Sequence, residues 1–136
     1  MKKIILFLII IATLISCSKL PDLGNRYKLG FGSFNDLILM NYKNTIIIDG
    51  LIVNYSFDSI FFIAKQKPRD FILKDTYDDP SMNIIKRDKI FEASTFFQYW
   101  IINKTTDSIF GPMTKEKYLK KFEELKIPKE LILKEE

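Results

Sequence analysis

The chain has no histidine and only one cysteine, Cys17. Without histidine it cannot form a Ser-His-Asp or Cys-His catalytic site, and one thiol cannot close an intramolecular disulfide or a multi-cysteine zinc site. No repeat with a period of about 20 to 50 residues is present, which argues against a solenoid or a propeller. The 136 residues allow one domain, and an apolar fraction of 47% is typical of a folded chain.

The N-terminus has the pattern of an export signal. Lys2 and Lys3 give a short basic start, and residues 4–15 form an uncharged, almost wholly apolar run. A helix of that length rises about 18 Å, well below the roughly 30 Å hydrocarbon core of a bilayer. The run is therefore too short for a spanning helix and fits the apolar region of a signal peptide.

The residues that end this run, Leu14-Ile15-Ser16-Cys17, resemble the lipobox of bacterial lipoproteins. In that motif the cysteine sulfur takes a diacylglyceryl group and the cysteine becomes the first residue of the mature chain. We predict a lipoprotein signal peptide over residues 1–16, lipidation of Cys17 and a lipid-anchored tether over residues 17–26. The alternative is an ordinary secretory signal with an incidental cysteine. Lipidation would place the protein on a membrane of the bacterial cell envelope.

The net charge does not indicate nucleic-acid binding. The formal charge is +4, and loss of Lys2 and Lys3 with the signal would lower it to +2. So small a charge, spread over a chain of mixed sign, is not the basic footprint that a nucleic acid requires. We expect no nucleic-acid partner.

Residues 27–136 are predicted to form a single α+β domain, a small antiparallel β-sheet with one C-terminal amphipathic helix packed on it. Apolar, aromatic and β-branched runs predict the strands, which lie over residues 27–32, 36–42, 44–49, 51–56, 60–66, 96–103 and 108–110. Along residues 51–57 the odd-numbered positions are apolar, and we expect them to face the core.

The helix is predicted over residues 115–126. Thr114 is a suitable N-cap, and Tyr118 and Phe122 belong to one apolar stripe. Pro128 ends the helix. Residues 69–95 are harder to assign: residues 71–73 suggest a short extra strand, and residues 82–92 either a poorly formed helix or irregular cover.

An acidic group in this region, Asp75, Asp78 and Asp79, is a weak candidate for a metal site. A hard cation requires about six to eight oxygen ligands in a loop that wraps it, and no glutamate stands at EF-hand spacing. Asp75 and Asp78 could also serve as a general acid and base. The simpler interpretation is a solvated loop, so no metal, cofactor or catalytic residue is assigned.

Four residues are candidates for binding a partner. Lys86, Arg87 and Lys89 follow the acidic group and could form a charged surface together with it. Trp100 lies in an aromatic group with Phe96, Phe97 and Tyr99, which suggests either a stacking platform for sugars or ordinary packing on both faces of a strand.

Several short segments together resemble a family of small bacterial lipoproteins classed as a domain of unknown function. They are Ile63-Ala64-Lys65-Gln66, Tyr99-Trp100-Ile101-Ile102-Asn103-Lys104, Gly111-Pro112-Met113 and Glu124-Leu125-Lys126-Ile127-Pro128. The resemblance covers residues 27–132 and implies no activity and no catalytic residues. In architecture alone, a sheet with a terminal helix also resembles some small immunity and inhibitor proteins.

Two classes of function follow. The first is a non-enzymatic envelope lipoprotein that binds a protein or a glycan at the membrane surface, with a lipid-anchored inhibitor or immunity factor as a special case. The second is a small carboxylate- or metal-dependent hydrolase. The absence of histidine, of a free thiol after lipidation and of a phosphate-binding loop favours the first.

Overall fold

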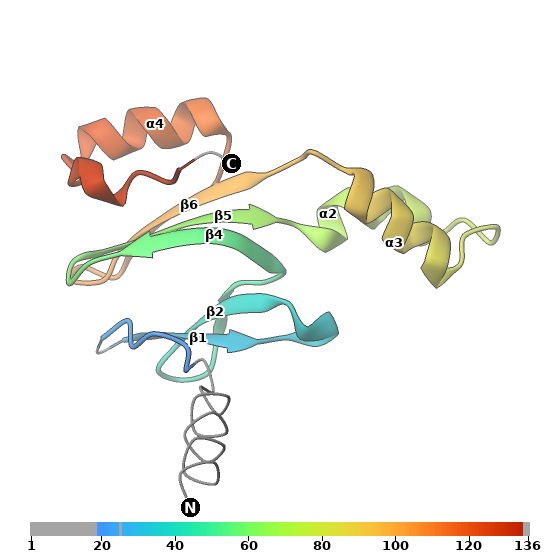
Figure 1. Ribbon diagram of the computed structural model, residues 1–136, viewed down its shortest axis with the longest axis horizontal. Coiled ribbons are helices and arrows are strands. Elements are labelled where there is room, and N and C mark those ends of the chain that lie inside the picture. The colour runs from blue at the N-terminus through green and yellow to red at the C-terminus, as the bar shows by residue number, and fades with distance from the viewer. Residues whose placement is uncertain (1–18, 25, 135–136) are drawn as a thin grey trace, which may run out of the picture.

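The structure is a computed structural model that describes residues 19–24 and 26–134. Within them the chain forms two antiparallel sheets (Figure 1). The smaller sheet has the order β1-β2-β3, with β1 at Tyr27–Phe31, β2 at Leu37–Asn41 and β3 at Ile46–Ile48. The larger has the order β4-β5-β6-β7, and its strands cover Leu51–Phe57, Phe61–Lys67, Gln98–Asn103 and Ser108–Met113.

These sheets and helix α4, Lys115–Glu124, form three layers (Figure 1). The smaller sheet covers one face of the larger sheet, where Leu39 and Ile48 meet Phe62 and Ile102. Helix α4 covers the other face with the buried residues Tyr118 and Phe122. Because both faces of the larger sheet are covered, its inner strand β5 is apolar on both sides, with Phe61, Phe62, Ile63 and Ala64 all buried.

The predicted α+β class with antiparallel strands is confirmed, but the strands divide between two sheets, and α4 is not the only helix of the domain. The chain changes sheet at Asp49 and Gly50, where Gly50 has a φ of +101°. Gln66 on β5 donates a side-chain hydrogen bond to the Asp49 carbonyl and fixes this passage. Thr114 caps α4 as expected, since its hydroxyl accepts from the Lys117 amide at 3.4 Å.

Strand β4 does not alternate as the sequence suggests. Ile52 is buried at 3% exposure, whereas Val53 is 43% exposed. The pairing with β5 shifts register between Ile52 and Asn54, which makes Val53 the extra residue of a bulge. Ile52 therefore shares the inter-sheet side with Tyr55 and Phe57, and the predicted core position of Val53 is wrong.

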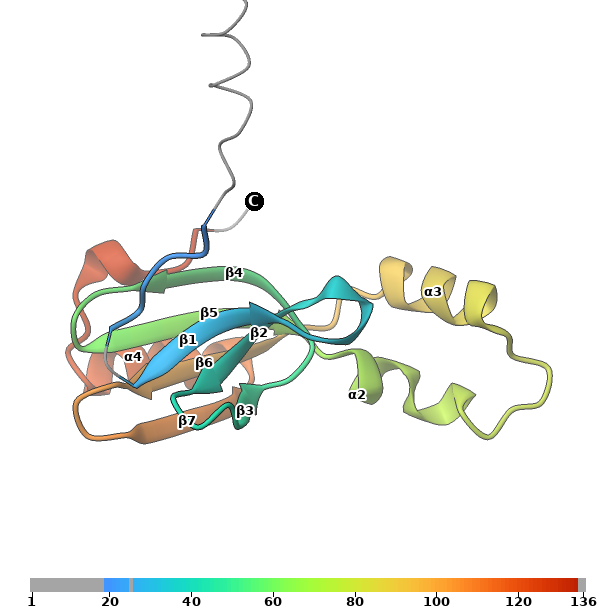
Figure 2. The same cartoon turned by 90° about the horizontal axis from the view of Figure 1, so that it is seen from below.

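The segment between β5 and β6 is a helical arm that extends from one end of the layers (Figures 1 and 2). It contains α2 at Arg69–Leu73, the 3-10 turn η2 at Lys74–Thr76 and α3 at Ile84–Ala93. The predicted strand over residues 71–73 is wrong, because these residues belong to α2. Of the two interpretations of residues 82–92, the helix is the one found, and the Asn83 side chain caps it by accepting from the Lys86 amide.

Two further 3-10 turns complete the described elements. They are η1 at Ser33–Asn35, between β1 and β2, and η3 at Lys129–Leu131, after α4. Every helix within residues 19–24 and 26–134 is too short or too polar to span a membrane.

Residues 19–24, the described part of the expected tether, pack against the domain. Leu23 is only 2% exposed and belongs to the core between the sheets. Lys104 holds this segment in place, because its Nζ donates to the carbonyls of Leu23 and Asp58. The ammonium is itself buried, and this burial lowers the pKa of Lys104.

Candidate functional site

The strongest concentration of charge and aromatic rings lies where the arm joins the sheets, and Arg69 is at its centre. This residue begins α2, and its side chain is 16% exposed. Its Nη1 donates to Asp88 of α3 at 3.1 Å. Its Nε lies 3.7 Å from Asp36 Oδ2, which is an electrostatic contact and too long for a hydrogen bond. Arg69 thereby connects the arm to the smaller sheet.

Two aromatic rings pack on the same guanidinium. Its central carbon lies 4.0 Å from the ring centroid of Phe91 on α3 and 4.5 Å from that of Phe34 in η1. Phe91 is buried, whereas Phe34 is 66% exposed. The Phe34 ring is therefore largely open to solvent while the Arg69 guanidinium packs against it.

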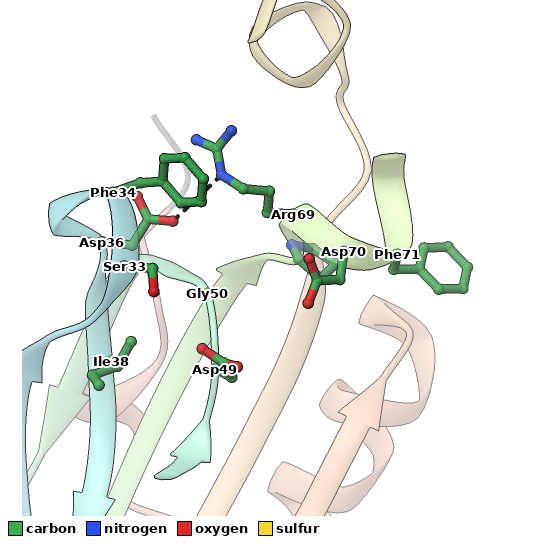
Figure 3. A pocket seen from close by; sticks show the side chains of 10 residues that line it. Ser33, Phe34, Asp36, Ile38, Asp49, Gly50, Arg69, Asp70 and Phe71 are labelled. Carbon is green, nitrogen blue, oxygen red and sulfur yellow. Dashed lines mark ion pairs between the residues drawn. The ribbon is translucent and has the colours of Figure 1, made fainter. Parts of the chain in front are cut away.

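A hollow of about 200 Å³ opens beside Arg69 (Figure 3). Its polar lining consists of Ser33, three carboxylates and the guanidinium of Arg69. Its apolar lining includes Phe34, Ile38 and Phe71. The three carboxylates are Asp36, Asp49 and Asp70. The hollow is thus acidic, with an exposed aromatic ring at its side.

The three carboxylates differ in their surroundings. Burial raises the pKa of Asp36, the charge of Arg69 opposes that rise and the charge of Asp49 adds to it. Asp70 accepts a hydrogen bond from the Tyr77 hydroxyl at 2.9 Å. Asp49 is exposed, and its backbone rather than its carboxylate takes part in the passage between the sheets. Asp49 and Asp70 are the two carboxylates available to a ligand from solvent.

Two of the predicted partner-binding cations, Lys86 and Arg87, form hydrogen bonds within the arm. Lys86 Nζ donates to the Ser81 carbonyl at 2.8 Å, and Arg87 donates to the Thr76 carbonyl at 3.1 Å. The Arg87 guanidinium also lies 5.3 Å from the ring centroid of Tyr77. Lys89 is exposed and forms no ion pair or hydrogen bond with the described residues.

Trp100 is also engaged within the fold. It is half-buried against the core between the sheets, and its Nε1 donates to Gln66 Oε1 at 2.7 Å. Of its neighbours in the aromatic group, Tyr99 is buried on the α4 side of the larger sheet. The Phe96 ring stacks on the Phe71 ring, with their centroids 4.8 Å apart. The structure therefore favours the packing interpretation over a sugar platform.

The acidic group of the arm does not form a cation site. Asp75 and Asp78 are exposed, and hydrogen bonds from Ser81 lower the pKa of Asp79. Within the described part of the chain, no three His, Cys, Asp or Glu side chains gather in a way that would hold a metal ion. Cys17, the predicted lipidation site, lies outside the described residues.

The sequence did not single out Arg69, Phe34 or Asp49, which come from three separate segments. The only local signal was the Pro68-Arg69-Asp70 interruption after a strand. No periodicity connects that interruption to η1 or to the β3–β4 passage, so their proximity follows from the packing of the two sheets and the arm.

Comparison with known proteins identifies the family. Residues 26–136 match a family described as a protein of unknown function (DUF3997), and the chain belongs to that family. This confirms the resemblance to a domain of unknown function. No curated protein and no solved structure matches the chain.

Proposed function

We propose that the protein is an exported bacterial lipoprotein, anchored through lipid on Cys17, whose domain binds a protein partner at the hollow beside Arg69. It acts as a non-enzymatic binding module at the membrane surface of the cell envelope. The observation that carries this proposal is the pairing of a small acidic hollow with the exposed ring of Phe34 on an element fixed by Arg69.

The size of the hollow favours a side chain over a metabolite. Pockets for small molecules usually enclose about 300 to 1,000 Å³, and this one encloses about 200 Å³. The opening would take the end of one side chain of a partner, and the surrounding surface would contact the rest of the partner's interface.

The charges indicate which side chain fits. Arg69 faces Asp36 and Asp88, which leaves Asp49 and Asp70 to attract a further cation. A lysine or arginine of the partner would place its charge near these two carboxylates and its methylene groups against Phe34. We therefore propose a partner that presents a basic residue. A lipid-anchored inhibitor or immunity factor is the case in which that partner is an enzyme.

A carboxylate-dependent hydrolase is the second candidate. One observation favours it: Asp36 is a buried carboxyl with a raised pKa in a hollow that also contains Asp49, and a general acid needs such a group. Against it, Arg69 lies beside Asp36 and favours the ionised form. The small volume also leaves little room for a substrate.

Site-specific crosslinking in the native host tests the binding proposal. A photoreactive amino acid at Phe34 of the full chain should capture a protein that the same group at Leu119, on α4, does not capture. Leu119 is a suitable control because it is also an exposed apolar residue, at 38%. Asp49→Lys should abolish the capture, and Lys89→Glu should leave it intact.

A charge exchange then separates a specific contact from a general loss of structure. Once the partner's basic residue is known, its replacement by aspartate should restore binding to the Asp49→Lys variant. Capture that persists in Asp49→Lys would contradict the proposed role of the hollow. A hydrolytic activity that disappears in Asp36→Asn, with no captured partner, would establish the second candidate instead.

A further inference from the structure

One end of the outer face of the smaller sheet, around Tyr42 and Ile46, carries exposed apolar groups and lies close to the start of the domain. Leu29, Leu39 and Ile48 point into the inter-sheet core, so their neighbours along the strands point outward. The outward set follows from the register, which pairs Lys28 with Met40 and Met40 with Ile46. Tyr42, two residues beyond Met40, is 63% exposed, and Ile46 is 47% exposed.

At the η1 end this face is covered, since Ile38, the outward neighbour of Leu39, is only 3% exposed, whereas Tyr42 and Ile46 at the other end are exposed. Met40 lies over Gly30, where an added Cβ would collide with the end of the methionine side chain. Helix α4 lies on the opposite side of the molecule, beyond the larger sheet (Figure 1). Exposed apolar groups gathered on one sheet face indicate a surface that is covered in the functional state.

The chain enters the domain beside this face. Lys28 and Tyr42 line a hollow together with Asp22 and Gly24 of the segment that precedes β1. That segment runs on the side of the smaller sheet in both views (Figures 1 and 2). The proposed lipid-bearing residue, Cys17, is two residues before Lys19, a reach of about 7 Å at most. The anchor would hold this corner of the domain against the headgroups.

The charges on the same face suit an anionic surface. Lys28 and Lys43 form no ion pair with the described residues, and Lys43 Nζ lies 5.5 Å from the ring centroid of Tyr42. Tyrosine and lysine together are typical of the interface between headgroups and hydrocarbon. Lysines near an anionic bilayer add attraction within about a Debye length, roughly 8 Å at physiological salt.

We propose that the outer face of β1–β3 rests on the lipid bilayer, with Met40, Tyr42 and Ile46 in the headgroup region and Lys28 and Lys43 on anionic lipid. This inference rests on the proposed lipid anchor at Cys17. Helix α4 then faces away from the membrane, and the hollow beside Arg69, which is lined in part by η1 of the same sheet, lies close to the membrane surface.

Labelling of the intact lipoprotein tests this orientation. Lipid occupies the only native thiol, so a cysteine introduced at one position accepts a fluorescent label selectively. Tyr42→Cys and Ile46→Cys report on the proposed face, and Leu119→Cys on α4 is the control. Each labelled protein is placed in vesicles of phosphatidylcholine and phosphatidylglycerol that carry nitroxide-labelled lipid. Quenching should be several-fold stronger at positions 42 and 46 than at 119.

A charge variant examines the lysines separately. Lys28→Glu with Lys43→Glu should reduce the quenching at position 46 in these vesicles, while Lys117→Glu on α4 should not change it. Equal quenching at positions 42 and 119, in a protein whose mass shows the acyl groups, would overturn the orientation and leave the anchor intact. A purified protein without acyl groups would overturn the anchor, and the orientation with it.

Discussion

Trp100 lies directly over Gly111, so that a Cβ atom on Gly111 would come within 2.6 Å of Trp100 Cε3. The same indole donates to Gln66, and Gln66 donates to the Asp49 carbonyl at the passage between the sheets. Edge strand β7, the centre of the larger sheet and the passage between the sheets are therefore connected through two side chains, Trp100 and Gln66. Trp100 thereby takes part in the packing of the fold, besides being the residue that the sequence suggests for ligand stacking.

Gly111→Ala should lower the free energy of unfolding by about 2 kcal/mol or more. The new methyl group would displace the indole, and Gly111 has a φ of +143°, which side chains disfavour. Gly24→Ala is the matched control, since Gly24 has a φ of +82° but no atom within 4 Å of the added Cβ. Its cost should be only about 1 kcal/mol, the strain alone. Urea denaturation measures both, and equal losses would contradict the role of the contact.

Arg69→Met should destabilise the protein by about 3 kcal/mol, because it leaves the buried Asp36 carboxylate without its counter-charge. The second variant Asp36→Asn should recover part of this loss in the Arg69→Met background. Arg26→Met is the control, because the Arg26–Asp107 pair is about half exposed on both sides, at 51% and 45%. It should cost less than about 1 kcal/mol.

Hydrogen exchange separates the local effect of Arg69→Met from a global one. Arg69 contacts Asp88 and Phe91 of α3. In the variant, the amides of α3 should therefore exchange faster relative to those of β5 and β6 than they do in the wild type. An unchanged ratio between the two regions would show that Arg69 does not hold the arm.

Alkaline pH should weaken the fold through Tyr118. Tyr118 is buried between α4, to which it belongs, and the larger sheet, and this burial raises the pKa of its hydroxyl above the ordinary value of 10.0. The stabilising contribution is complete below pH 10, where both states keep the proton, and is lost as the pH rises through the raised folded-state pKa. The free energy of unfolding should therefore fall less steeply above pH 10 in Tyr118→Phe than in wild type. An unchanged slope in Tyr118→Phe would contradict this role of Tyr118.

Cys17→Ser should abolish acylation in the native host. The thiol is the only one in the chain, and the lipid requires it. We expect an unprocessed chain or release from the membrane fraction, detected by intact mass and by fractionation. If the Cys17→Ser variant shows the same mass change as the wild type and stays in the membrane fraction, the lipobox interpretation is refuted.

The sequence predicted the parts of this fold whose signals are local. Helix α4 was predictable because its N-cap, apolar stripe and terminating proline lie within one segment. Strands β5 and β6 were predictable because buried strands require continuous apolar runs. The alternation of a strand places Trp100 and Ile102 on one face of β6 and Tyr99 and Ile101 on the other.

Local pattern failed where a single residue changes the geometry or where short segments depend on contacts elsewhere. The bulge at Val53 changes which residues of β4 face the core on either side of it, and no distinctive residue in the sequence marks its position. Phe71, Ile72 and Leu73 have strand-like composition but form a helix, where Leu73 is buried and Phe71 stacks on Phe96 from the other end of the arm.

The amino-acid sequence alone determined the α+β class and the family, and it carries the prediction of export and of lipid on Cys17, because each depends on composition or on residues close together in the chain. Only the tertiary structure decided that the strands form two sheets, that Lys86, Arg87 and Trp100 make hydrogen bonds within the fold, and that Arg69 gathers Asp36, Asp88, Phe34 and Phe91. A guanidinium is buried only where several distant groups surround it together. The candidate site therefore exists only when the smaller sheet and the arm pack against the same end of the larger sheet.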